Sequence, residues 1–293
     1  MNVLDGKVVV VTGSGRGIGR AIAHGVAAAG AKVVVCDYGV SLTGREPSSE
    51  VAEKVVSEIS AKGGEAVAVF DTVTSMAGGA RMVQSGVDTW GRVDGVVCCA
   101  GVLRHRPFIE MSEGDFDGVI ETHLKGHFTV FRAAFEVMVR QRTGGSLIGI
   151  SSGYVHGDPL RASYRAAKAG VVALTKSAAL AGAEHGITAN CISPVANTRM
   201  TEASQLHFES EPEDIAPMAV YLLSGRGRGV TGKVFSVMGD TIGVWGDPEQ
   251  VRLVRHTQRW TQDQIDEEMA WLRDGVTASV ETPPLGPATL DQR

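Results

Sequence analysis

The chain has 293 residues, of which 43% are hydrophobic and 21% are charged, and its net charge is −5. This composition is typical of a globular protein whose core is large enough to fold without cross-links. An acidic chain has no global basic field to attract nucleic acid, and no apolar run reaches the ~20 residues that a membrane helix needs. We therefore expect neither nucleic acid nor a membrane as a partner.

The four cysteines and the N-terminal residues of the chain indicate the cellular compartment in which the protein is expected. Cys36, Cys98, Cys99 and Cys191 form neither a CxxC motif nor a visible pattern of pairs, which favours buried free thiols in a reducing environment. The N-terminal sequence MNVLDGKVVVVTG lacks the cationic start and long apolar stretch of a signal peptide. Both observations favour a cytoplasmic protein, and no metal ion is expected as a cofactor.

Segments typical of strands and of helices alternate along the first 245 residues. Strands are predicted at 7–13, 32–37, 65–71, 93–101, 145–152, 187–194 and 231–240. Helices are predicted at 17–29, 48–64, 79–91, 112–141, 163–186 and 212–224. This alternation predicts an α/β fold in one domain, 1–245, built on a Rossmann-type doubly wound parallel sheet of about seven strands.

The pattern changes after residue 245. One helix is predicted at 262–273, with Thr261 as its N-cap, and a Pro-rich tail follows at 280–293. We therefore expect residues 246–293 to form a C-terminal extension with one helix.

The stretch TGSGRGIG, residues 12–19, lies between the first predicted strand and the first predicted helix. Glycines at this place permit a tight turn and let a diphosphate approach the free N–H groups of the helix. Close packing of the strand against the helix is the alternative explanation. The candidate cofactor-binding residues of this turn are Gly13, Gly15, Arg16, Gly17, Ile18 and Gly19.

Asp37 ends the second predicted strand. A carboxylate at this place can accept hydrogen bonds from an adenosine ribose, and it would repel the 2′-phosphate of NADP. The sequence therefore favours NAD over NADP as the cofactor. Arg16 is the opposing signal, because its cation could bind that phosphate.

The stretch YRAAK places Tyr164 and Lys168 one turn apart on one helical face. A phenol has a pKa near 10, and a neighbouring ammonium group lowers that pKa by favouring the phenolate. Such a pair can exchange a proton with the oxygen of an alcohol or a ketone. The same spacing also arises by chance on helices, and a serine at the end of the preceding strand strengthens the catalytic interpretation.

Together these motifs resemble the short-chain dehydrogenase/reductase family over about residues 5–243. The resemblance implies hydride transfer to or from a nicotinamide cofactor, with Tyr164 as the acid/base. It also implies that Lys168 holds the nicotinamide ribose, and that the protein is a homotetramer. The further cofactor-binding residues that it implies are Asp71, Thr72, Cys99, Ala100, Gly101, Pro194 and Thr198, beside Tyr164 and Lys168.

Three positions depart from the family pattern. Cys98 and Cys99 replace two asparagines of a turn, which we expect to weaken backbone support near the adenosine ribose. His123 replaces an asparagine whose backbone carbonyl takes part in a proton relay, so His123 is a catalytic candidate, with a core histidine as the alternative. The strand register predicts Ser152 as the catalytic serine, whereas the usual spacing from Tyr164 would give Ser151.

Four further stretches, VLRHRPF, THLKGHF, PVANTRMTE and PEDIAPMAVYLL, resemble a subgroup of that family, the (3R)-hydroxyacyl-CoA dehydrogenase units of peroxisomal multifunctional enzymes. The resemblance implies a 3-hydroxyacyl-CoA as the substrate. A hydroxysteroid is the alternative, and a non-catalytic dinucleotide-binding relative is a weaker one. Basic residues on the loops expected at the mouth of the site would attract a phosphate-bearing substrate: Arg104, His105, Arg106, Arg161, Arg165 and Arg199.

Overall fold

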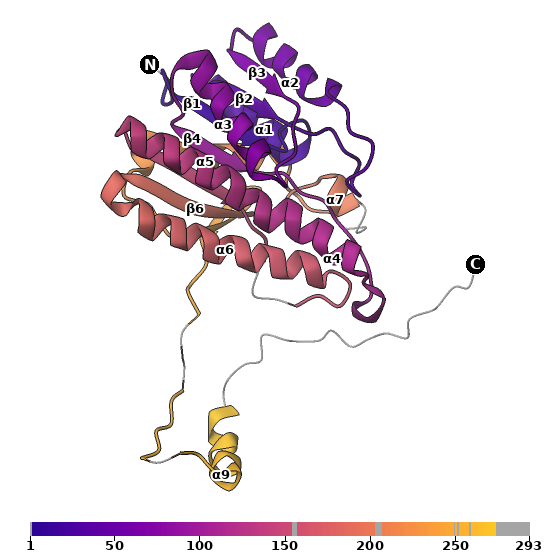
Figure 1. The fold of residues 1–293 in the computed structure, drawn as a ribbon, viewed down its shortest axis with the longest axis vertical. Coiled ribbons are helices and arrows are strands. Elements are labelled where there is room, and N and C mark those ends of the chain that lie inside the picture. Colours follow the sequence, from indigo (N-terminus) through magenta and orange to yellow (C-terminus); the bar gives the residue numbers. More distant parts are fainter. Residues whose placement is uncertain are drawn as a thin grey trace, which may run out of the picture. The chain divides into compact units, whose positions relative to one another are not determined.

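A single sheet organises the computed structural model of the chain (Figure 1). Its strand order is β3-β2-β1-β4-β5-β6-β7-β8, in which neighbours pair in parallel except β7 and β8. This order, with its reversal beside β1, confirms the doubly wound fold. The strands are β1 (Val8–Thr12), β2 (Lys32–Cys36), β3 (Ala66–Val69), β4 (Gly95–Cys98), β5 (Gly145–Ile150), β6 (Ile187–Pro194), β7 (Val234–Met238) and β8 (Thr241–Val244).

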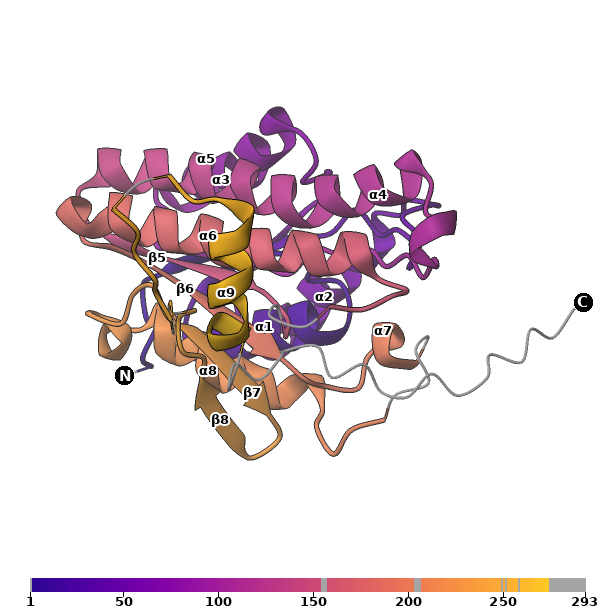
Figure 2. The same ribbon diagram turned by 90° about the horizontal axis from the view of Figure 1, so that it is seen from below.

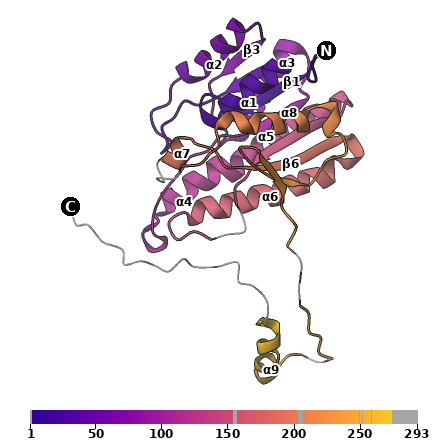
Figure 3. The ribbon, with the colours of Figure 1, turned by 180° about the vertical axis from the view of Figure 1, so that it is seen from behind.

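Successive side chains of β1 alternate between the two faces of the sheet. Val9 and Val11 pack with α1, α2 and α8 on one face, whereas Val8 and Val10 pack with α3 and α5 on the other. Because both faces are covered, the central strands read as unbroken apolar runs. Figures 1 and 3 show the two layers of helices from opposite sides, and Figure 2 shows the sheet between them.

Most helices lie within a few residues of the predicted ranges. The helices are α1 (Gly17–Ala28), α2 (Glu50–Ala61), α3 (Met76–Trp90), α4 (Glu113–Ile120), α5 (Gly126–Gln141), α6 (Ala162–Gly182), α7 (Arg199–Glu202), α8 (Ala216–Leu223) and α9 (Gln262–Arg273). None of the helices that the structure describes is long and apolar enough to cross a membrane.

Three elements differ from the sequence prediction. The predicted strand 231–240 ends earlier and turns at Gly239, where φ is +52°, into the antiparallel strand β8, so the sheet has eight strands in the described chain rather than about seven. The predicted helix 112–141 is divided by a π-helical segment, Glu121–Lys125. The short helix α7 follows β6 where no helix was predicted.

The structure describes residues 2–153, 157–202, 207–248, 250, 252–257 and 259–273. The described residues up to Trp245, apart from Gly157, form one compact unit, and those from Gly246 belong to a second. In the second unit, the predicted helix α9 begins after Thr261, whose hydroxyl accepts the N–H of Gln264 at 3.3 Å as an N-cap. The predicted Pro-rich tail, 280–293, lies outside the described residues.

Candidate active site

The glycine turn between β1 and α1 leaves no room for a side chain at Gly13 or Gly19. A Cβ atom on Gly13 would lie 2.6 Å from backbone atoms of Ala100, and one on Gly19 would lie 2.1 Å from the carbonyl oxygen of Gly13. No side chain caps the first turn of α1, so its N–H groups remain available to an anion. A backbone cradle next to an uncapped helix of 12 residues fits the diphosphate of a dinucleotide.

Asp37 follows β2 and faces the glycine turn. Its Oδ2 accepts the backbone N–H of Gly15 at 2.7 Å, and its Oδ1 accepts the N–H of Gly39 at 2.7 Å. Each carboxylate oxygen can accept a second hydrogen bond, so the group can hold the turn and still bind ribose hydroxyls. The carboxylate of Asp37 therefore lies beside the glycine turn, and its role as a ribose acceptor stays a prediction.

Asp71 and Thr72 follow β3. Asp71 pairs with Arg81 at 2.5 Å and accepts the N–H of Thr72 at 2.8 Å. The hydrogen bond from Arg81, together with that from Thr72 and against the opposing effect of burial, holds the pKa of Asp71 below its usual range. The carboxylate is thereby ionised and fixed at the carboxyl end of the sheet, next to the predicted adenosine side.

The turn after β4 is supported by Thr12. The Thr12 hydroxyl accepts the N–H groups of Cys99 and Ala100, at 3.2 and 3.3 Å, and its carbonyl accepts the Cys99 N–H at 3.1 Å. Thr12 therefore supplies hydrogen bonds at the turn where the two cysteines replace the family's asparagines. Gly101, the last predicted residue of this turn, touches His123: a Cβ there would lie 2.4 Å from the imidazole Cε1.

Tyr164 and Lys168 lie on α6, as the spacing predicted. The Lys168 ammonium is buried and lies 5.5 Å from the centroid of the Tyr164 ring. It donates a hydrogen bond to the carbonyl oxygen of Ile150, the last residue of β5, at 2.6 Å. The end of β5 therefore fixes the cation beside the phenol. Tyr164 also meets the imidazole of His123 edge to face, with 5.2 Å between the ring centroids.

The two candidate serines differ in their surroundings. Ser151 is buried, and its hydroxyl donates to the backbone carbonyl of Lys168 at 3.1 Å. Ser152 is half-buried, and among the described residues its hydroxyl has no hydrogen-bond partner. Ser151 therefore ties β5 to α6, whereas Ser152 offers a hydroxyl that a substrate could use. Residues 154–156, which follow, lie outside the described chain.

The π-helical segment positions two buried histidines. Nε2 of His123 lies 2.8 Å from the carbonyl oxygen of Val102 and 3.2 Å from its nitrogen. One turn later, Nδ1 of His127 donates to the carbonyl oxygen of His123 at 2.5 Å. Burial, and then the charge of Lys168, lowers the pKa of both rings, to about 3 for His127. Both histidines are therefore neutral near pH 7.

Pro194 and Thr198 lie at the end of β6 and in the loop after it. Thr198 is close to the glycine turn: a Cβ on Gly17 would lie 3.5 Å from its Cγ2. Its hydroxyl accepts the N–H of Met200 at 3.2 Å, a hydrogen bond at the start of α7. The loop between Thr198 and Pro212 includes 203–206, which lie outside the described residues.

The basic residues at the mouth of the site are only partly neutralised, because four arginines share two carboxylates. Arg104 and Arg106 both face Asp115, at 3.7 and 3.6 Å. Arg161 pairs with Asp158 at 2.5 Å, and Arg165 lies 3.9 Å from the same carboxylate. The positive field of this rim is therefore weaker than the sequence indicated.

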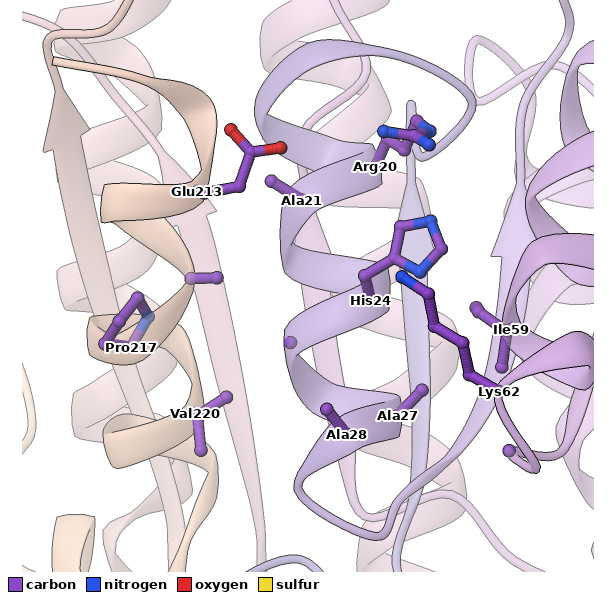
Figure 4. A pocket seen from close by; sticks show the side chains of 13 residues that line it. Arg20, Ala21, His24, Ala27, Ala28, Ile59, Lys62, Glu213, Pro217 and Val220 are labelled. Carbon is purple, nitrogen blue, oxygen red and sulfur yellow. The ribbon is translucent and has the colours of Figure 1, made fainter.

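A separate cavity of about 550 Å³ lies on the face of the sheet covered by α1, α2 and α8. Figure 4 shows α1 in its centre, with Glu213, Pro217 and Val220 on one side and Lys62 on the other. None of the predicted catalytic residues lines it.

Comparison with known proteins decides the family. The profile described as short chain dehydrogenase matches residues 7–208. The chain belongs to the short chain dehydrogenase family. As a member of this family it is an oxidoreductase that acts on CH–OH groups, and the family binds NAD(P).

Three similar proteins are informative. The peroxisomal multifunctional enzyme type 2 of Mus musculus is 42% identical over 221 residues, which are 74% of this chain but only 30% of that enzyme. The hydroxyacyl-CoA dehydrogenase ChsB1 of Mycobacterium tuberculosis is 36% identical over 289 residues, covering 92% of this chain and 89% of the relative. The crystal structure of a short chain dehydrogenase from Mycobacterium avium superimposes with a TM-score of 0.84 at 41% identity, covering 92% of this chain and 95% of that one. The predicted resemblance to the dehydrogenase unit of the multifunctional enzymes is confirmed.

Sequence reasoning missed two residues at this site. Thr12 was included in the glycine motif but not recognised as the support of the turn after β4. His127 stands four residues after His123 in the stretch HLKGH, and this i, i+4 spacing was the available signal.

Proposed function

We propose that this short chain dehydrogenase uses NAD to oxidise the 3-hydroxyl group of a 3-hydroxyacyl-CoA. The observation that carries the proposal is the position of Tyr164, whose ring lies close to both the imidazole of His123 and the fixed ammonium of Lys168. The name of the relative from Mycobacterium tuberculosis, a hydroxyacyl-CoA dehydrogenase that the chain covers almost completely, supports the substrate class.

Each residue would have a distinct role. Ser152 would donate a hydrogen bond to the substrate oxygen, and Tyr164 as phenolate would take the proton of the 3-hydroxyl group. Lys168, held by the carbonyl of Ile150, would stabilise the phenolate by its charge. The glycine turn and Lys168 would hold NAD, which would supply the acceptor for the hydride of the carbinol carbon, so that the product would be a 3-oxoacyl-CoA. His123 would fix the turn after β4 through the backbone of Val102.

The test is a comparison of substrates by NADH formation. We expect (3R)-hydroxyacyl-CoA thioesters to be oxidised by the wild-type protein and not by Tyr164→Phe, whose NADH affinity should be unchanged. The KM for the thioester should rise with ionic strength, because it carries phosphate groups, while the KM of a neutral hydroxysteroid should not. If the protein oxidises hydroxysteroids efficiently and does not oxidise CoA thioesters, the proposal is wrong and the steroid alternative replaces it.

A cytoplasmic location is also proposed. It is supported by Cys36, Cys98, Cys99 and Cys191, which are all free thiols, as is usual in a reducing compartment. The relatives named as peroxisomal enzymes make the peroxisome the location to compare in imaging of the tagged protein.

A further inference from the structure

Two arginines from distant parts of the sequence meet at one backbone oxygen. Nη1 of Arg16 and Nη1 of Arg199 each donate to the carbonyl oxygen of Val40, both at 3.1 Å. Among the described residues neither guanidinium forms an ion pair, in contrast to the paired arginines of the rim. Burial, and then the charge of Arg16, lowers the pKa of Arg199, against an opposing effect of Asp37. Two like charges that share a neutral acceptor form a site suited to an anion.

The place of this pair identifies the anion. Arg16 belongs to the glycine turn and directly precedes α1, and Arg199 follows Thr198, which touches Gly17 across the turn. The pair therefore flanks the uncapped N-terminus of α1, the part of the cradle that fits a diphosphate.

We propose that Arg199, together with Arg16, binds the diphosphate of the dinucleotide cofactor, and that the carbonyl of Val40 holds the two guanidinium groups in place before the cofactor binds. A diphosphate offers full negative charges where the carbonyl offers only a dipole, and charge-assisted hydrogen bonds are shorter and stronger. The inference rests on the proposed function only in that the chain binds a dinucleotide.

The loop that carries Val40 is itself anchored. The carbonyl of Leu42 accepts the N–H of Leu103 at 3.1 Å, and the carbonyl of Thr43 accepts a hydrogen bond from the guanidinium of Arg104. These contacts join the loop after β2 to the loop after β4. Val40 is therefore held at a fixed place, and Arg199 is oriented before any ligand arrives.

Binding of NADH, measured by titration calorimetry, tests the proposal without turnover. We expect Arg199→Gln to raise the Kd for NADH about tenfold or more, because a hydrogen bond to a charged group is lost. Arg199→Lys, which keeps the charge, should recover part of the affinity. Arg45→Gln is the matched control, since Arg45 is an exposed arginine of the same loop as Val40 and should leave the Kd unchanged. Thermal unfolding of each variant checks that it is folded.

Two further titrations separate the other phosphate groups. CoA is titrated into protein saturated with NADH, and NADPH is titrated into the free protein. If Arg199→Gln weakens CoA binding and leaves the Kd for NADH unchanged, the arginine serves the substrate and the proposal is overturned. A loss confined to NADPH assigns the pair to the 2′-phosphate and also overturns it. No NADH binding by the wild-type protein would overturn this proposal and the dinucleotide proposal together, whereas an unchanged Kd in Arg199→Gln overturns this one alone.

Discussion

The imidazole of His123 is packed directly against the turn that carries Gly101. A Cβ atom on Gly101 would lie 2.4 Å from Cε1 of the ring, and Nε2 of the same ring is hydrogen-bonded to the backbone of Val102. The histidine thus fills the space that the glycine leaves and fixes the next residue. The missing side chain at position 101 and the ring at position 123 are a single packing unit.

Gly101→Ala should therefore destabilise the protein, by about 1–3 kcal/mol for an overpacked site. Gly101→Ala should cost less in a His123→Ala background than in the wild-type protein, because the ring that clashes has been removed. Gly114→Ala is the control, because a Cβ there meets no other atom within 4 Å. Free energies of unfolding from urea titrations give the coupling; additive losses in the double variant would show that the two positions are independent.

The buried histidines should make stability depend on pH. The pKa of His127 is about 3 in the folded protein, below its unfolded value near 6.5. The unfolded chain therefore binds a proton first, and stability is lost as the pH falls below 6.5. At pH 5 the loss from His127 is about 2 kcal/mol, and His123 contributes in the same direction.

Urea unfolding at pH 7 and pH 5 measures this loss in the wild-type protein and in His127→Gln, which cannot be protonated in this range. The free energy of unfolding that is lost between pH 7 and pH 5 should be smaller in the variant by the part that His127 contributes, about 2 kcal/mol. The acidic groups with lowered pKa, such as Asp71 and Asp158, titrate below this window. Equal pH dependence in both proteins would contradict a neutral His127.

The fold could be predicted because its signals are local. The run Val8–Val11 is apolar on both faces of its strand, and such runs between helical periods indicate a parallel sheet. The strand β8 was missed because the prediction continued one strand through Gly239, although Gly239–Asp240 is a hairpin signal. The π-helical segment was missed because Glu121–Lys125 is only about one turn long, too short for a change of period to show in the sequence.

The site could be predicted only where its residues lie within one motif. Tyr164 and Lys168 are one turn apart, so their proximity follows from helix geometry. Arg16 and Arg199 converge on Val40 across 159 residues of sequence between Val40 and Arg199, and no spacing rule connects them. Contacts of that kind depend on how loops close above the sheet, which the sequence pattern does not encode locally.

The serine at the end of β5 can be assigned by substitution. Ser152→Ala should lower kcat about 10²-fold, because a hydrogen bond to the reacting oxygen is removed, and it should leave the free energy of unfolding unchanged. Ser151→Ala should instead lower stability by about 1 kcal/mol, since its hydroxyl joins the backbone of α6. Steady-state kinetics and urea unfolding of both variants separate the roles. A larger loss of kcat in Ser151→Ala would show that Ser151 is the catalytic serine and that the prediction of Ser152 from the strand register was wrong.

A homotetramer remains a prediction, with α4, α5 and α6 at its interfaces. Large apolar side chains on these helices are exposed in the single chain: Phe116, Phe128 and Leu180, the last at 81%. Light scattering at micromolar concentration should give about four times the chain mass of 30.8 kDa. Leu180→Lys should shift that mass downward, because it buries a charge in an apolar contact. A monomer mass for the wild-type protein would refute the assembly.

Asp37 should select NAD over NADP. Its carboxylate would repel a 2′-phosphate, while its Oδ2 also holds the N–H of Gly15. Asp37→Asn removes the charge and keeps one acceptor oxygen, for Gly15, while the contact with the N–H of Gly39 is lost. The glycine turn should therefore persist while the ratio of kcat/KM for NAD to that for NADP falls. We expect a fall of about tenfold, which corresponds to about 1.4 kcal/mol. Arg16→Gln tests the alternative, in which Arg16 binds the 2′-phosphate. If the wild-type protein uses NADP with the same kcat/KM as NAD, and Arg16→Gln lowers kcat/KM for NADP alone, then Arg16 rather than Asp37 governs the choice of nucleotide.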